Sequence, residues 1–591
     1  MFFGSFAFRE GLSTNRGGNL VTKKKLLVVL LMMVLAMVLI VGCDRGGNDG
    51  SGAAPGRGTP GTADFNPMAP FYPPITVTSV RRTVATAVFE EGLSWEDNVW
   101  SRAFEEELGI IVDYIWLEDA AGYVARLNLQ IASGDIPDLM WVYDTQIATM
   151  QRGNMLMDLT DVFETYATHN LRNELLYQQD GMNLAGARNA DGRLMKLPSV
   201  LLGPADFATT LWIRYDWLQN VGLGVPTTID EFMEVARAFT HDDPTGTGQQ
   251  TFAMGVAGIG NLLTDWGGLH TFFEMFGVQP GWWFSGMLFY EELPNGDIVY
   301  SGSLPGMTEA LTHLQRMFAD GQIPPDFPTV DAGGRLIEDM ITSTIGIFGG
   351  APWVGGWPIG TNVLPENPGS DWVAIPPPSA TGQPHRYRVY QPASSWNAVS
   401  ARMQHPEAII MMANFFVDIQ HGYDGRHPRW PDFNPIPGVR NDGRGGVVSP
   451  MRVSPPRMAE INYRAINNAL ATGNTDGLTG MQYNQVASAL TWMNELNPMG
   501  WNSFWANSGQ PNTINHTIFD RMVHYGQNHN AHMGILTDLM DERFAIFRSE
   551  AERIVTEIIM GTAPVSAWDD FMVEWDRLGN QEVIAEILSL R

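Results

Sequence analysis

Residues 133–144 read SGDIPDLMWVYD and predict the end of a helix, a tight turn and a short buried strand. Gly134 suits a helix C-cap because it has no Cβ to oppose a left-handed conformation. Pro137 keeps the helix from resuming. The apolar run 139–143 has the length of a strand. A helix followed so closely by a buried strand is typical of an α/β sheet.

Three side chains at the end of this strand are candidates for ligand contact: Trp141, Tyr143 and Asp144. Ligands of open α/β sheets bind at the carboxyl ends of the strands. An aromatic ring next to a carboxylate suits a sugar, because the ring packs on C–H groups and the carboxylate accepts from hydroxyls. The alternative for Trp141 is an ordinary place in the core.

The segments before residue 133 extend the same pattern. Apolar runs predict strands at 83–89 and 110–117, and helices that end at Gly109 and Gly134 separate the strands. Strands that alternate with helices of this length predict a parallel, helix-covered sheet. The loop after the first strand lies at the same sheet edge as Asp144, which makes Glu90 and Trp95 further ligand-binding candidates.

Length and composition exclude several classes of protein. The 591 residues exceed one hydrophobic core and predict at least two domains. An apolar content of 44% indicates a folded chain. A net charge of −28 argues against a nucleic-acid partner. No P-loop, nucleophile elbow or zinc-protease motif is present, and we expect no catalytic residue, no metal site and no cofactor.

The N-terminal segment predicts export. Three lysines at 23–25 precede an apolar run of signal-peptide length, and IVGC at 40–43 resembles a bacterial lipobox. This resemblance implies cleavage after residue 42 and lipidation of Cys43, the only cysteine of the chain. Residues 1–42 are therefore expected to be a lipoprotein signal peptide, and residues 43–74, rich in Gly, Pro and Ser, a flexible linker. Translation is expected to start at Val21.

Later motifs resemble a known family when they are taken in order. The stretch 133–138, the strand–helix–turn–helix at 211–239, the Gly-rich IGIFGGAPW at 345–353 and the His-Pro-Glu helix start at 405–407 are similar to segments of extracellular solute-binding proteins of the maltose-binding type. In the second of these, Thr228 and Glu231 are expected to form an N-terminal capping box.

The resemblance implies a type II fold of periplasmic binding proteins. Two lobes, each a helix-covered mixed sheet, would be joined by a multi-strand hinge. The expected N-terminal lobe comprises residues 75–208 and 388–456, and the expected C-terminal lobe comprises residues 209–387 and 457–591. The stretch 372–378 is expected to be a strand of the hinge.

The same resemblance adds site residues. A Trp after the strand at 345–350 stacks on sugar in maltose-binding relatives, and Asp144 occupies the place of a sugar-contacting Asp. Aromatic residues at strand ends complete the candidate ligand-binding set with one further carboxylate: Trp212, Asp265, Trp353, Trp357 and Trp396. The loop 243–248, DPTGTG, resembles a calcium loop, but Thr245 and Thr247 replace ligands, so a plain turn is expected.

The predicted function is that of the substrate-binding lipoprotein of an ABC importer. It would be a monomer on the extracellular face of the cell membrane, anchored by lipid on Cys43, with an oligosaccharide as ligand and ABC permease transmembrane subunits as partners. Two alternatives stay open. One is a secreted glycoside hydrolase or polysaccharide-processing enzyme, which would share the signal and the acidity. The other is a sensor, or a binder of a non-sugar solute, with the same fold.

Overall fold

The computed structural model describes residues 57–590 except for 84–86, 178–183, 185, 190, 202–207, 265, 283–285, 381, 383–385, 390–392, 421–427, 434–438, 441–447, 454–457, 479, 512 and 533–535. The predicted signal peptide, Cys43 and the first part of the predicted linker lie outside the described residues. Among the described residues, no helix has the length and apolarity that a membrane span requires.

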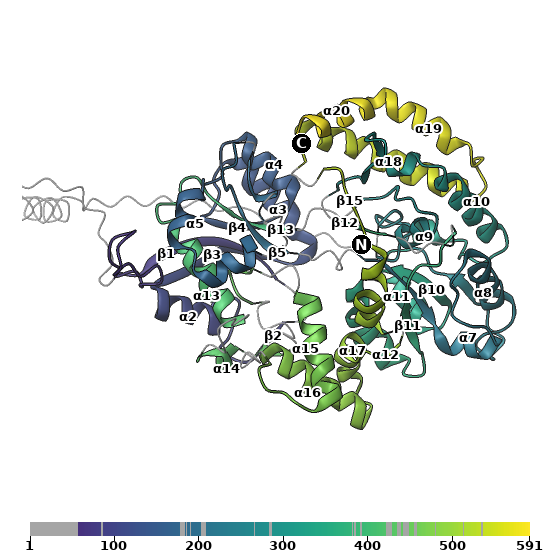
Figure 1. Cartoon of the computed structure of the whole chain (residues 1–591), viewed down its shortest axis with the longest axis horizontal. Helices are drawn as coiled ribbons and strands as arrows, with labels where there is room; N and C mark the ends of the chain where they lie inside the picture. The colour runs from purple at the N-terminus through teal and green to yellow at the C-terminus, as the bar shows by residue number, and fades with distance from the viewer. Residues whose placement is uncertain are drawn as a thin grey trace, which may run out of the picture. The chain divides into compact units, whose positions relative to one another are not determined.

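The N-terminal lobe is built on a five-stranded sheet in the order β3-β1-β4-β13-β5 (Figure 1). β1 is parallel to β3 and β4, whereas β13 is antiparallel to both β4 and β5, so the sheet is mixed. The bounds are β1 (Ile75–Arg82), β3 (Ile110–Glu118), β4 (Leu139–Val142), β5 (Leu197–Leu201) and β13 (Ala393–Val399). β13 returns to this sheet from far along the chain, as the predicted lobe crossing requires.

Helices cover both faces of this sheet. Figure 1 shows α3 and α4 on one face, and α2 with α13 on the other. The bounds are α2 (Val99–Leu108), α3 (Ala120–Ser133), α4 (Asp144–Arg152), α5 (Thr160–Tyr166), α6 (His169–Arg172), α13 (Glu407–Gln420) and α14 (Trp430–Phe433). The apolar positions of the predicted α2, Trp100, Phe104 and Leu108, are all buried in one continuous core.

The first strand differs from its prediction. It runs from Ile75 to Arg82. Within the predicted span 83–89, whose residues 84–86 lie outside the described part of the chain, Val88–Phe89 form a short strand, β2, paired with β14 (Val439–Arg440). Eight residues of β1 pair in parallel with β3, and this pairing decides the position. The carboxyl end of β1 therefore carries Arg81 and Arg82.

Residues 57–74 differ from the predicted flexible linker. Arg57 is buried, donates a hydrogen bond to the Ala69 carbonyl at 2.7 Å, and its guanidinium lies 4.4 Å from the centre of the Phe71 ring. Ala69 and Phe71 are buried as well. An apolar anchor and a buried cation therefore hold this segment on the N-terminal lobe, and composition alone did not reveal this contact.

The C-terminal lobe is built on a four-stranded sheet in the order β11-β6-β10-β7. β6 (Thr210–Arg214) is antiparallel to β10 (Ile345–Gly350) and β11 (Trp372–Ile375), and β10 is parallel to β7 (Phe252–Met254). The expectation of a hinge strand at 372–378 is wrong, because β11 pairs along its whole length with β6 inside this sheet.

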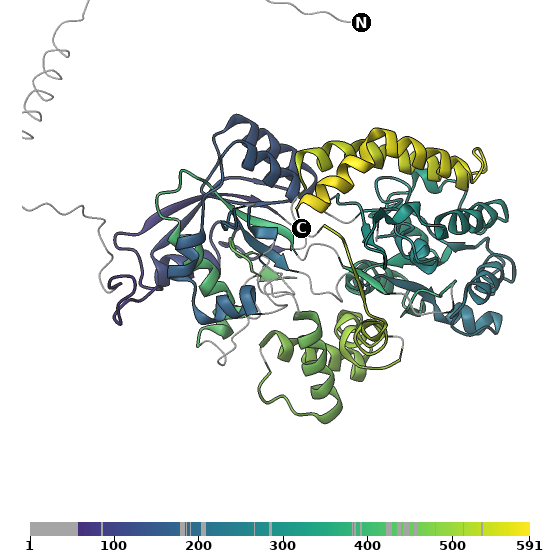
Figure 2. The ribbon, with the colours of Figure 1, turned by 45° about the horizontal axis from the view of Figure 1, so that its top comes forward.

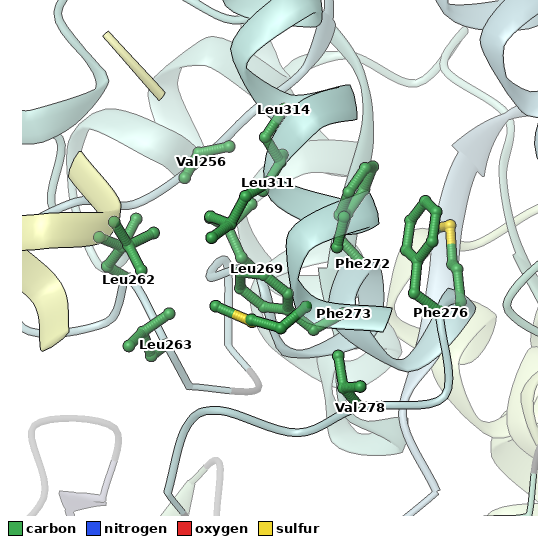
Figure 3. Packing of buried hydrophobic residues seen from close by; sticks show 14 of the residues in the cluster. Val256, Leu262, Leu263, Leu269, Phe272, Phe273, Phe276, Val278, Leu311 and Leu314 are labelled. Atoms are coloured by element: carbon green, nitrogen blue, oxygen red, sulfur yellow. The ribbon is translucent and has the colours of Figure 1, made fainter. Parts of the chain in front are cut away.

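The core of this lobe is rich in Leu and Phe. Figure 3 shows Leu269, Phe272 and Phe273 facing Leu311 and Leu314 of α10. The helices of the lobe have these bounds: α7 (Tyr215–Val221), α8 (Ile229–His241), α9 (His270–Met275), α10 (Gly306–Ala319), α11 (Arg335–Ile341), α12 (Leu364–Glu366), α18 (Asp538–Ile559), α19 (Ala567–Trp575) and α20 (Gln581–Ser589). The expected capping box of α8 is present, with Thr228 accepting from the Glu231 amide.

Three further helices form a small layer of their own, visible in light green in Figures 1 and 2: α15 (Met458–Thr472), α16 (Gly480–Glu495) and α17 (Pro498–Asn507). They pack against one another, and Tyr463 and Trp501 join the core of the C-terminal lobe. The remaining short strands pair as β8 (Tyr290–Glu292) with β9 (Ile298–Tyr300) and β12 (Tyr387–Val389) with β15 (Gln527–His529).

A buried ionic cluster holds β12 in the C-terminal lobe. Arg388 lies 3.2 Å from a Glu291 carboxylate oxygen and 3.6 Å from one of Glu274, and it donates to the Gly277 carbonyl at 2.8 Å. Thr209, just before β6, donates to Glu274. The first entry of the chain into this lobe, at Thr209, and its exit near Arg388 therefore meet one set of buried charges.

Candidate functional site

The carboxyl edge of the N-terminal sheet carries an aromatic and cationic surface. Trp141, at the end of β4, packs edge-to-face on Tyr143 with ring centres 5.0 Å apart. The Arg82 guanidinium lies 5.4 Å from the Trp141 ring centre and donates to the Tyr143 hydroxyl at 3.2 Å. Trp141, Tyr143 and Arg82 are all partly exposed. This part of the predicted site is therefore brought together at one edge.

The loop between β1 and α2 adds a second aromatic group. Trp95 packs on Phe89 at 5.3 Å, and the Arg81 guanidinium lies 5.3 Å from the Trp95 ring centre. Arg81 also donates to the Ser449 carbonyl at 2.6 Å. Glu90 is exposed in a turn next to this group. Successive strand residues point to opposite faces, so Arg81 and Arg82 flank the two sides of the sheet edge.

Burial governs the protonation of Tyr143. The pKa of its phenol is raised because the partly buried ring resists ionisation, although the Arg82 guanidinium opposes this shift. The hydroxyl therefore stays neutral at physiological pH. It accepts from Arg82 and keeps its own proton as a donor for a neighbouring group.

Asp144 and Trp396 do not lie on this surface, and the expectation that they contact a ligand directly is not supported by their burial. Asp144 is 4% exposed and Trp396 is 1% exposed. The Trp396 indole nitrogen donates to Asp144 Oδ1 at 2.7 Å, and Lys196 Nζ lies 3.8 Å from the same oxygen. The Asp144 carboxylate therefore already has a hydrogen-bond donor and a cation from within the protein.

Lys196 completes this buried cluster. Its side chain is fully buried, and Nζ lies 3.6 Å from the centre of the Trp396 ring. Burial lowers the pKa of Lys196 to about 7, although the neighbouring Asp144 carboxylate works against this shift. The only lysine after residue 25 thus serves the interior of the N-terminal lobe.

The C-terminal lobe contributes a cluster of three tryptophans. Trp353 and Trp357 follow β10 and stack with ring centres 5.9 Å apart and planes 23° from parallel. Trp266 lies 5.5 Å from each of them. Trp357 is 40% exposed, Trp353 is partly exposed and Trp266 is nearly buried. The two predicted residues are therefore supported from below by a third ring.

Trp212 is part of the core and not of a binding surface. It is 1% exposed, it lies in β6 opposite Phe348, and the two rings are nearly parallel with centres 6.4 Å apart. The expectation that it forms a sugar platform is therefore wrong for the described conformation, because no face of its ring reaches solvent. Asp265 lies outside the described residues.

The loop at Asp243 closes on itself. The Asp243 carboxylate accepts from the Gly248 amide at 3.1 Å and from the Thr245 hydroxyl at 3.1 Å, and the Thr245 and Thr247 hydroxyls are 2.7 Å apart. This arrangement is a hydrogen-bonded turn. Among the described residues, no group of three His, Cys, Asp or Glu side chains is placed to hold a metal ion.

The sequence reasoning missed Arg81, Arg82, Lys196 and Trp266, the residue that follows the candidate Asp265. A signal for the arginines was present, since they end a strand-like run. Because the first strand was placed eight residues too late, they were read as preceding the strand. Nothing in the sequence pointed to the contact between Lys196 and Asp144.

Comparison with known proteins adds three observations. The sequence model of the family described as "Bacterial extracellular solute-binding protein" matches residues 86–417. Lipoprotein LipO of Bacillus subtilis (strain 168) is 25% identical over 39% of this chain and 42% of its own length. The polygalacturonan/rhamnogalacturonan-binding protein YtcQ of the same organism is 26% identical over 37% of this chain and 39% of its own length. The match thus spans about two fifths of each relative.

The fold has solved counterparts. An HMO-binding, ABC-transporter-associated solute-binding protein from Bifidobacterium longum infantis ATCC 15697 aligns over 88% of this chain and 98% of its own with a TM-score of 0.60 and 14% identity. At this identity the likeness concerns the fold alone. The predicted fold class, a type II arrangement of two helix-covered mixed sheets, is confirmed.

Proposed function

Because the chain belongs to the bacterial extracellular solute-binding protein family, we propose that it is the substrate-binding lipoprotein of an ABC importer. It captures an oligosaccharide and delivers it to the transmembrane subunits of a permease. The protein performs no covalent step. It binds the oligosaccharide, encloses it between the lobes and releases it to the permease.

One observation carries this proposal: each lobe presents partly exposed tryptophans at the carboxyl ends of its strands. In the N-terminal lobe these are Trp95 and Trp141, and in the C-terminal lobe they are Trp353 and Trp357. Indole faces pack on the C–H faces of sugar rings, and two such surfaces suit a ligand held from both sides. Single exposed tryptophans are common, but paired sets at equivalent edges of two sheets favour a ligand.

The polar groups beside these rings supply hydrogen bonds. Tyr143 offers its phenolic proton, Glu90 offers acceptor oxygens and Arg82 offers N–H donors. These groups fix the orientation of a ligand whose hydroxyls they satisfy, and the rings supply most of the buried apolar area. Hinge bending between the lobes would then bury the sugar, and the closed form would dock on the permease.

The lobes of this proposal follow the expected division, residues 75–208 with 388–456 and residues 209–387 with 457–591. We shift the second boundary to follow Val389, since β12 pairs with β15. Cys43 carries the lipid anchor at the extracellular face of the membrane, and the protein acts as a monomer. Mass spectrometry of the N-terminal peptide of the mature protein would contradict the anchor if it found Cys43 without a lipid.

The experiment is a thermal-shift screen of the full chain, purified in detergent, against neutral and acidic oligosaccharides of three to six sugars. A ligand that binds only the native state stabilises it by about 2.7 kcal/mol at 100 times its Kd. We expect one class to raise the melting temperature and to be recovered intact by mass spectrometry. Recovery of a cleaved product would favour the glycoside hydrolase. No shift with any sugar would favour a non-sugar solute.

A further inference from the structure

Two arginines occupy the sheet edge where the proposed ligand binds. Arg81 and Arg82 end β1, and their guanidinium groups lie 5.3 Å and 5.4 Å from the ring centres of Trp95 and Trp141. Each aromatic platform of the N-terminal lobe therefore has a cation beside it. A neutral sugar can accept hydrogen bonds from these guanidinium groups, but only an anionic ligand also gains from their positive charges.

Arg82 is the more informative of the two. It donates to the Tyr143 hydroxyl at 3.2 Å, and its Nε is buried without a hydrogen bond among the described residues. Within the part of the chain that the structure describes, no carboxylate lies within ion-pair distance of it. By contrast, Arg214 pairs with Asp216 at 2.6 Å and Arg388 pairs with Glu291 at 3.2 Å. The chain has 64 acidic residues against 36 basic ones, so a carboxylate partner would be easy to supply.

We propose that this edge recognises the carboxylates of an acidic oligosaccharide, with Arg82 as the principal receptor and Arg81 as a second one. The guanidinium presents its N–H groups in a planar fork that matches a carboxylate, and such charge-assisted bonds are stronger than bonds to neutral hydroxyls. Trp141 and Trp95 receive the sugar rings to which these carboxylates are attached. The ligand is thus a chain of uronate residues. This inference rests on the proposed function, whose ligand class it narrows.

The net charge of −28 does not oppose this assignment at contact distance. Salt at physiological ionic strength screens charges beyond about 8 Å, so distant surface carboxylates act weakly on a bound ligand. The buried carboxylate of Asp144, which follows Tyr143 in the chain, has Lys196 at 3.8 Å. Glu90 is exposed on the same edge, where solvent screens it. The local electrostatic potential at Trp141 is therefore determined mainly by the positive charge of Arg82.

The test compares matched acidic and neutral ligands by calorimetry on the full chain in detergent. The probes are three- to six-residue oligomers of galacturonate, of mannuronate with guluronate, and of glucuronate with xylose. The control for each is the same oligomer after reduction of its carboxyl groups, which keeps the backbone and removes the charge. We expect at least one acidic oligomer to bind roughly 10- to 100-fold more tightly than its reduced form.

Variants locate this preference. Arg82→Gln should lose most of the difference between the acidic oligomer and its reduced form, whereas Arg82→Lys, which keeps the charge without the fork, should lose part of it. Arg577→Gln is the control, because it makes the same change of net charge at an arginine whose side chain is 75% exposed and pairs with Glu574. If Arg82→Gln fails to fold, the comparison of acidic and reduced oligomers on the wild-type chain still shows whether the protein prefers carboxylates.

Three outcomes are distinguishable. Tighter binding of an acidic oligomer that depends on Arg82 supports the inference. Binding of reduced oligomers as tight as that of every acidic form overturns the inference and leaves the oligosaccharide receptor intact. Absence of binding by any oligosaccharide, neutral or acidic, overturns both this inference and the proposed function.

Discussion

Replacing Asp144 with Asn tests whether this residue belongs to a buried ionic cluster or to the ligand surface. The substitution keeps the size of the side chain and an oxygen for the Trp396 indole, whose bond to the carboxylate is 2.7 Å long. It removes the negative charge that lies 3.8 Å from the buried Lys196. The structure therefore predicts a loss of stability with a particular dependence on pH.

The magnitude follows from the pKa of Lys196, which burial lowers to about 7. Without Asp144 this pKa falls further, because the carboxylate is the group that opposes the lowering. At pH 8 to 9 the folded wild type already holds mostly neutral Lys196, so the variant loses only the charged acceptor for Trp396, about 1 kcal/mol.

Below pH 7 the wild type keeps a protonated Lys196 in both the folded and the unfolded state, and this residue adds no further dependence on pH. The variant still releases a proton on folding, so its stability falls by up to about 1.4 kcal/mol for each unit that the pH drops. At pH 5 the two contributions together reach up to about 4 kcal/mol. This corresponds to roughly 4 °C in Tm if the whole chain unfolds together and to roughly 8–16 °C if the N-terminal lobe unfolds alone.

The assay is thermal unfolding of wild type and Asp144→Asn between pH 5 and pH 9. The double variant with Lys196→Met is the control, because it lacks the titrating amine and should show no growing penalty at low pH. A penalty that is constant with pH, or largest at pH 9, would refute the ionic-cluster reasoning. An unchanged Tm together with lost sugar binding would place Asp144 on the ligand surface instead.

Three further predictions concern other parts of the chain. Trp357→Ala should weaken oligosaccharide binding, measured by calorimetry, by about 1–2 kcal/mol, or roughly 5- to 30-fold. The control Tyr72→Ala, at an exposed ring near the amino end of β1, should leave the affinity unchanged. Equal losses in the two variants would contradict a role of Trp357 in binding. Chelation of calcium should shift Tm by less than about 1 °C, because the loop at Asp243 is closed by its own hydrogen bonds. A calcium-dependent rise in Tm would contradict this prediction and reveal a metal site. Arg57→Ala should lower the free energy of unfolding by about 2 kcal/mol and expose residues 57–74 to limited proteolysis. If the variant resists the protease as well as the wild type does, Arg57 does not hold this segment.

Much of the N-terminal lobe follows from local patterns in the chain. Gly109 and Gly134 adopt positive φ at the ends of their helices, as expected of residues without a Cβ, and Trp100, Phe104 and Leu108 bury one helix face. The Thr228 capping box is equally local. These features depend on residues within a few positions of one another, so the sequence specifies them directly.

The position of the first strand could not be predicted from local patterns. Residues 75–82 and 83–89 both contain apolar and β-branched residues, and only the parallel pairing with β3 selects the first. This displacement hid Arg81 and Arg82 from the predicted site. Pairing between segments far apart in the chain has no local signature that fixes the register.

The one-dimensional chain contains the helix caps, the residue types at the ends of strands and the ordered family motifs. These were enough to predict the fold class. Which aromatic rings face solvent is another matter. Trp212 and Trp396 end up buried while Trp357 is 40% exposed, and Lys196 meets Asp144 although 51 positions separate them. Exposure and charge pairing depend on what packs against a side chain from distant segments, so only the tertiary structure decided them.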